Sequence, residues 1–98
     1  MSTNTRYSAL FFALMMLIAG ATHALEPIKL GAVVPLNDVI GKQSANAMKL
    51  AVKEINLAGG VLGRPLELII SDDGMNAEKG TAAIDKLATV DKVDFFVG

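Results

Sequence analysis

The stretch from Met48 to Asp73 constrains the fold of this 98-residue chain more than any other part of it. Its first half predicts a helix, because its apolar residues recur at spacings of three and four and so share one face. These residues are Met48, Ala51, Val52 and Ile55. The pair Gly59-Gly60 then ends the helix, since glycine adopts the left-handed conformation that a C-terminal cap requires. The nearly continuous apolar run over residues 66–70 is typical of a strand buried on both faces of a parallel sheet.

Capping residues indicate where the helices begin. The first helix is expected to start at residue 43 or 44 and to end at residue 58, with Ser44 as its N-cap, because a hydroxyl oxygen can accept a bond from a free backbone N–H. A second helix is expected over residues 77–90, with Asn76 as its N-cap. The predicted buried stripe of this second helix is Ala83, Ile84, Leu87 and Ala88.

The expected strands alternate with these helices along the chain. They cover residues 28–36, residues 66 to 71 or 72, and residues 93–97. Strands separated by helical crossovers predict an α/β fold with a parallel sheet and right-handed connections. We therefore expect the βαβαβ start of a doubly wound parallel sheet, which begins this way in both of its common strand orders. In the order with strand one central, a ligand binds beyond the carboxyl ends of strands one and three, beside the loop over residues 37–42.

Residues 1–24 have the pattern of a secretory signal peptide. Arg6 and the amino terminus supply positive charge, an apolar run covers residues 9–21, and small residues precede a cleavage point before Leu25. The apolar run is shorter than the roughly 18 residues that a membrane-spanning helix needs. We expect cleavage to leave residues 25–98 as the mature chain, without stable membrane insertion.

Composition excludes several classes of protein. The chain has no cysteine, which excludes a disulfide framework, thiol chemistry and a lipid-bearing cysteine. Its single histidine, His23, belongs to the expected signal peptide, so the mature chain is expected to bind no transition metal. The formal net charge is −1, and no basic face is apparent, so nucleic acid is not an expected partner.

Two motifs invite a cofactor or metal interpretation, and both are better explained by structure. The cluster of Gly59, Gly60 and Gly63 follows a helix, whereas a dinucleotide fingerprint needs glycines directly after the first strand. The pair Asp72-Asp73 lacks a third acidic residue from a second loop that would complete a metal site. We therefore expect no cofactor, no metal site and no catalytic residue.

The run INLAGGVLGRPLELIISDD, residues 55–73, resembles a segment of the type I periplasmic ligand-binding proteins. The branch it resembles binds leucine, isoleucine and valine for ATP-driven import. The matching positions are Glu54, Ile55, Asn56, Ala58, Gly59, Gly60, Val61, Gly63, Asp72 and Asp73. The resemblance implies the strand order 2-1-3 and makes residues 25–98 the expected N-terminal part of lobe 1 of a periplasmic ligand-binding domain. It implies a non-enzymatic receptor that closes two α/β lobes around an amino acid or a similar small solute. It also implies delivery of this solute to the membrane permease of an ABC transporter.

The candidate ligand contacts are Asn37, Ile40 and Gly41, in the loop expected after the first strand. In the family, the residue before the loop glycine often leans over the ligand's side chain, and Ile40 holds this position. A nearby helix N-terminus would favour an anionic group such as a carboxylate. The loop is shorter than is usual in the family, and Asp38 replaces a common glycine. An ordinary solvent-exposed loop would fit these residues equally well.

Other functions remain open at this point. A sensor lobe of a signalling or regulatory receptor would have the same fold and the same export signal. A secreted enzyme is a weaker alternative, because the mature chain offers no nucleophile–base pair and no histidine. The resemblance covers only part of a full family member, so we expect a fragment or a truncated product whose main ligand contacts lie beyond Gly98.

Overall fold

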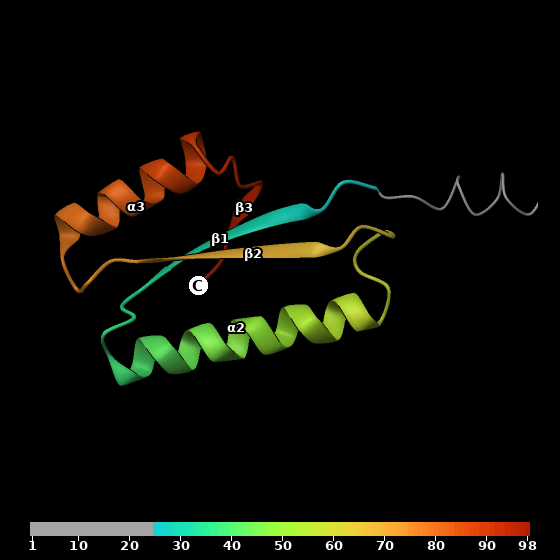
Figure 1. Cartoon of the computed structure of the whole chain (residues 1–98), viewed down its shortest axis with the longest axis horizontal. Helices are drawn as coiled ribbons and strands as arrows, with labels where there is room; N and C mark the ends of the chain where they lie inside the picture. The colour runs from blue at the N-terminus through green and yellow to red at the C-terminus, as the bar shows by residue number, and fades with distance from the viewer. Residues whose placement is uncertain (1–24) are drawn as a thin grey trace, which may run out of the picture.

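Strands and helices alternate along residues 25–98, the part of the chain that the computed structural model describes (Figure 1). The elements are β1 (Ile28–Val34), α2 (Val39–Leu57), β2 (Leu66–Asp72), α3 (Ala77–Thr89) and β3 (Phe95–Phe96). The predicted signal peptide over residues 1–24 lies outside the described residues. None of the helices in residues 25–98 is long and apolar enough to cross a membrane.

The three strands form a parallel sheet in the order β2-β1-β3, which confirms the predicted fold class and strand order. β1 pairs with β2 along its whole length, whereas β3 pairs with β1 only at Leu30 and Gly31. The helices α2 and α3 lie on opposite faces of the sheet (Figure 1). β2 and β3 lie on opposite sides of β1, so the two crossovers run in opposite directions across the sheet. Because both crossovers are right-handed, their helices lie on opposite faces.

Small residues let both helices approach the sheet closely. The buried apolar side chains are Ala32, Val34, Ala45, Ala83 and Leu87. Leu87 on α3 is fully buried, and its Cδ1 would lie 3.4 Å from a Cβ atom added at Gly31 of β1. Within residues 25–98, four of the five buried apolar residues are alanine or valine, so this core is thin and depends on close backbone approach rather than on large side chains.

The segment that carries the family resemblance folds as a helix end, a turn and a strand, as predicted. Gly59 and Gly60 have φ values of 109° and 79°, and the Gly60 N–H donates to the Ile55 carbonyl at 2.9 Å. The Asn56 side chain then joins the helix end to β2. Its Oδ1 accepts from the Leu66 N–H at 2.8 Å, and its Nδ2 donates to the Leu66 carbonyl at 2.9 Å. This side chain therefore fixes where β2 begins.

The start of the first helix was predicted too late in the chain. α2 begins at Val39, and its N-cap is Asp38, whose Oδ2 accepts from the Ile40 N–H at 2.9 Å. Ser44 lies inside the helix, so its predicted role as N-cap is wrong. The carboxylate of Asp38 is at least as good a cap as a hydroxyl, and it comes first along the chain. Residues 39–42 are therefore helical and not part of a loop.

Other boundaries differ less from the prediction. β2 has the expected limits, and Asn76 is the N-cap of α3, where its Oδ1 accepts from the Glu78 and Lys79 N–H groups. β1 ends two residues earlier than expected, at Val34. β3 covers only Phe95–Phe96 instead of residues 93–97, and both of its side chains are exposed.

The buried faces of the helices are narrower than predicted. On α2, Gly41 and Ala45 are buried and Met48 and Val52 are half-buried, but Ala51 is exposed and Ile55 is 38% exposed. On α3, the predicted stripe is correct for Ala83 and Leu87 and wrong for Ile84 and Ala88, which are exposed. Since the sheet formed by the described residues has three strands, it covers one row of residues on each helix and leaves the neighbouring row uncovered.

Candidate functional site

The candidate ligand-binding residues lie at the carboxyl edge of the sheet, where β1 leads into α2. The chain turns after β1, with the Asp38 N–H donating to the Pro35 carbonyl at 3.2 Å. Asn37 is exposed within this turn, and Ile40 is 68% exposed in the first turn of α2. The structure thus brings a polar amide and a large apolar side chain to the same edge, both open to contact.

Gly41 is buried, in contrast to its two neighbours in the predicted site. A Cβ atom added to Gly41 would lie 1.8 Å from the Pro35 carbonyl oxygen and 2.9 Å from the Pro35 Cγ. The absence of a side chain therefore lets the first turn of α2 lie directly against the end of β1. Gly41 therefore contributes to the candidate site indirectly, because it allows the helix that carries Ile40 to lie close to the end of β1.

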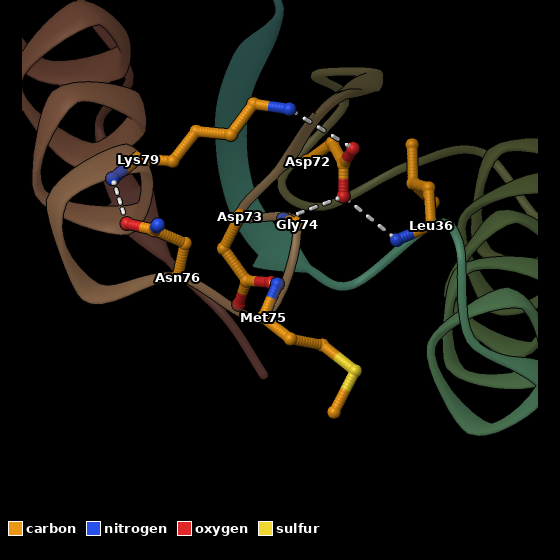
Figure 2. Close-up of polar contacts among 7 residues, drawn as sticks. All are labelled: Leu36, Asp72, Asp73, Gly74, Met75, Asn76 and Lys79. Carbon is orange, nitrogen blue, oxygen red and sulfur yellow. Dashed lines mark hydrogen bonds and ion pairs between the residues drawn. The ribbon is translucent and has the colours of Figure 1, made fainter.

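The loop after β2 lies beside the loop after β1, and Asp72 joins them (Figure 2). Asp72 Oδ1 accepts from the Leu36 N–H and from the Gly74 N–H, each at 2.9 Å. Its Oδ2 lies 3.6 Å from the Lys79 Nζ on α3. The Leu36 N–H, then the Gly74 N–H and then the charge of Lys79 lower the pKa of Asp72 below its ordinary value of 3.8. The carboxylate is therefore the favoured form of Asp72 in the folded protein.

Asp73 has a local role, although it adjoins Asp72. Its Oδ1 accepts from the Met75 N–H at 2.8 Å, two residues further along the same loop. Among residues 25–98, no three acidic, histidine or cysteine side chains come together in a group that could hold a metal ion. No pocket is found among the described residues.

Sequence reasoning placed Asn37 and Ile40 at this edge but missed two features of it. Val39, the first residue of α2, and Met75, in the loop after β2, add exposed apolar side chains to this edge, at 64% and 72% exposure. Asp72 was interpreted as the end of a strand, and its bond to Leu36 was not foreseen. The only local signal for Asp72 was its position as the last residue of a strand expected to pair with the first strand.

Comparison with known families decides the identity of the fold. A family described as "Periplasmic binding protein" matches residues 27–98. The chain belongs to the periplasmic binding protein family. A Brucella abortus (strain 2308) relative named "Leu/Ile/Val-binding protein homolog 1" is 33% identical over 89 residues, which cover 88% of this chain and 24% of the relative. A Pseudomonas aeruginosa "Amino acid binding protein" is 29% identical over 96 residues, covering 95% of this chain and 26% of that protein.

Solved structures of transporter substrate-binding proteins agree with this assignment. The branched-chain amino acid transporter substrate-binding protein LivJ from Streptococcus pneumoniae, in complex with isoleucine, has a TM-score of 0.68 at 29% identity. The similarity covers 74% of this chain and 22% of LivJ. A fatty acid ABC transporter substrate-binding protein from Thermomonospora curvata has a TM-score of 0.59 at 29% identity, covering 74% of this chain and 18% of that one.

The predicted resemblance to the leucine, isoleucine and valine-binding branch is confirmed by these relatives. The chain spans about a quarter of the length of the curated relatives it matches. The proteins with which it shares its fold are named as substrate-binding proteins for amino acids or fatty acids.

Proposed function

We propose that residues 25–98 form part of lobe 1 of the substrate-binding component of an ABC importer. Its ligand is a branched-chain amino acid or a similar small solute. The observation that carries this proposal is the exposed Ile40 at the carboxyl edge of the sheet, in a chain similar to proteins named for leucine, isoleucine and valine. In a doubly wound sheet, this edge is where ligands bind.

Ile40 and Asn37 would divide the recognition of the ligand between them. An isoleucine side chain that becomes fully buried gains about 1.5–3 kcal/mol, so covering an apolar ligand with the exposed Ile40 would favour binding. The Asn37 amide offers two donors and an acceptor to a polar group of the ligand. Gly41 contributes indirectly, because its contact with Pro35 sets the direction in which Ile40 projects.

The ligand's carboxylate is expected to bind away from the start of α2. Asp38 already occupies the Ile40 N–H, and its negative charge would repel a second carboxylate at this helix end. In contrast to the expectation from sequence, we therefore expect no anionic group of the ligand at the α2 N-terminus. Other parts of a longer, two-lobed receptor would hold the carboxylate and the amino group of the ligand.

The proposal includes an environment and a partner. Export through a cleaved signal peptide would place the receptor in the periplasm, where the closed, ligand-loaded form would dock on a membrane permease. The role is transport and not catalysis, and it requires no cofactor or metal ion. Family membership and the names of the relatives support this part of the proposal.

Isothermal titration calorimetry of the full-length protein that contains residues 25–98 tests the ligand class. We expect saturable binding of L-isoleucine, L-leucine or L-valine, and weaker or no binding of L-serine and L-glutamate. Decanoate, a fatty acid, is titrated in the same way, because one structurally similar protein is named as a fatty acid transporter substrate-binding protein. Preference for decanoate would reassign the ligand to fatty acids, and preference for L-glutamate would contradict an apolar site.

A further inference from the structure

β1 and β2 diverge at the carboxyl edge, and Asp72 lies at the point of divergence. The two strands remain paired as far as Val34 and Asp72. After this pair, the chain from β1 leads to α2 on one face of the sheet, and the chain from β2 leads to α3 on the other (Figure 1). The Leu36 N–H lies beyond the paired part of β1, and the side chain of Asp72 accepts its hydrogen bond. A side chain thus continues the connection between the strands where their backbones separate.

A single oxygen of Asp72 makes the connection. Oδ1 accepts from the Leu36 N–H of one loop and the Gly74 N–H of the other, each at 2.9 Å (Figure 2). Backbone N–H groups that donate to a carboxylate form stronger bonds than those between neutral groups. These two bonds therefore restrain the loop over residues 35–38 relative to β2, independently of any ligand.

Asp72 reaches this loop from the side opposite the expected ligand. In the order β2-β1-β3, the ligand crevice of a doubly wound sheet opens between β1 and β3, whereas Asp72 belongs to β2. We propose that Asp72 is a positioning residue that fixes the loop over residues 35–38, and through it Asn37 and Ile40, for ligand binding. The part of this inference that concerns the ligand rests on the proposed function.

The hydrogen bonds of Asp72 matter more for this role than its charge does. The ion pair with Lys79 spans 3.6 Å, and the Lys79 side chain is 61% exposed, so this contact is weak. Asparagine at position 72 would keep an acceptor oxygen in place for both N–H groups while removing the charge. Alanine would remove the acceptor altogether and leave the loop over residues 35–38 without its link to β2.

The neighbouring aspartate provides a matched control. Asp73→Ala removes the same charge one residue away, but the Asp73 side chain bonds only to Met75 within its own loop. Lys79→Met removes the ion pair and leaves both Asp72 hydrogen bonds intact. Only Asp72→Ala should therefore release the loop after β1.

The first measurement is the affinity of the full-length protein for L-isoleucine. If the released loop is in its binding conformation about a tenth of the time, the dissociation constant of Asp72→Ala rises about tenfold. Asp72→Asn, Asp73→Ala and Lys79→Met should stay within about twofold of the unaltered protein. Equal affinity of Asp72→Ala and Asp73→Ala, in proteins that both fold, would overturn the inference.

The second measurement needs no ligand, so it separates this inference from the proposed function. Amide hydrogen exchange of Leu36, followed by NMR, should accelerate about tenfold or more in Asp72→Ala and stay unchanged in Asp73→Ala. The Gly60 amide, which bonds to the Ile55 carbonyl at the other end of α2, serves as the internal reference. A protein that binds no L-isoleucine but shows this exchange pattern would refute the ligand and support the role of Asp72. Unchanged Leu36 exchange in Asp72→Ala would overturn that role.

A third readout covers the case in which Asp72→Ala does not fold. In the unaltered protein, the Leu36 and Gly74 amide protons should shift together as Asp72 becomes protonated on acidification, because both donate to the same oxygen. In Asp72→Asn this common shift should disappear. Independent titration of the two amides, or no shift of Leu36, would contradict the link between the loops.

Discussion

Gly41→Ala should destabilise the lobe, although alanine is the better helix former. The added Cβ atom would lie 1.8 Å from the Pro35 carbonyl oxygen and 2.6 Å from its carbonyl carbon. Ordinary van der Waals contact begins at 3.4 Å, so the start of α2 and the end of β1 would have to separate by about 1.6 Å. Both groups belong to the backbone, and neither can move aside as the end of a flexible side chain could.

The net effect follows from two opposing contributions. Forced overpacking costs typically 1–3 kcal/mol, and a clash with backbone atoms favours the upper end, about 3 kcal/mol. The higher helix propensity of alanine offsets at most about 1 kcal/mol of this. We therefore expect Gly41→Ala to lower the free energy of unfolding by about 2 kcal/mol.

Gly80→Ala is the matched control, because Gly80 is also a helical glycine. A Cβ atom added there would lie 3.5 Å from the Asp73 Cβ, which is an ordinary contact. This variant should be more stable than the unaltered protein by about 0.5–1 kcal/mol. Urea unfolding followed by circular dichroism measures both variants of the full-length protein. Similar stabilities of Gly41→Ala and the unaltered protein would refute the close packing of α2 against Pro35.

Three further predictions concern the core, the acid response and processing. Leu87→Ala should cost about 2–5 kcal/mol of unfolding free energy, because Leu87 is fully buried, whereas Ile84→Ala, at a half-exposed position, should cost less than about 1 kcal/mol; urea unfolding compares them. The lowered pKa of Asp72 means that its carboxylate contributes stability above pH 3.8 that is lost as the pH falls through the folded-state pKa. The unfolding midpoint should therefore fall less on acidification in Asp72→Asn than in the unaltered protein. N-terminal sequencing of the exported protein should begin at Leu25, and an uncleaved chain in the membrane would contradict the predicted signal peptide.

The elements that the sequence predicts well are those with a local physical signature. The glycine pair after α2 adopts the left-handed conformation that only glycine takes easily. Asn76 caps α3 by accepting from the backbone N–H groups of Glu78 and Lys79, two and three residues further along the chain. The parallel sheet follows from the alternation of strands and helices, and the family resemblance then selects the strand order 2-1-3. These features depend on a few consecutive residues or on chain topology, both of which are visible in sequence.

The features that sequence reasoning missed depend on contacts between distant residues. Gly41 was interpreted as a turn residue, but its role comes from a packing contact with Pro35, so the helix start was placed too late. The helix faces were predicted too wide, because periodicity does not reveal how much sheet lies beneath a helix. The Asp72 bond to Leu36 spans 36 positions in the chain, and no local pattern signals such a contact.

The affinity of Ile40→Ala for L-isoleucine tests the central claim, that the carboxyl edge of this sheet contacts the ligand. Ile40 is 68% exposed, so its removal should leave the unfolding midpoint unchanged while the lost contact raises the dissociation constant about tenfold, equivalent to about 1.4 kcal/mol. Leu50→Ala, at a 57% exposed position further along α2, is the control and should change neither quantity. Calorimetric titration of both variants of the full-length protein gives the answer. Equal affinities of Ile40→Ala, Leu50→Ala and the unaltered protein would show that the ligand binds elsewhere.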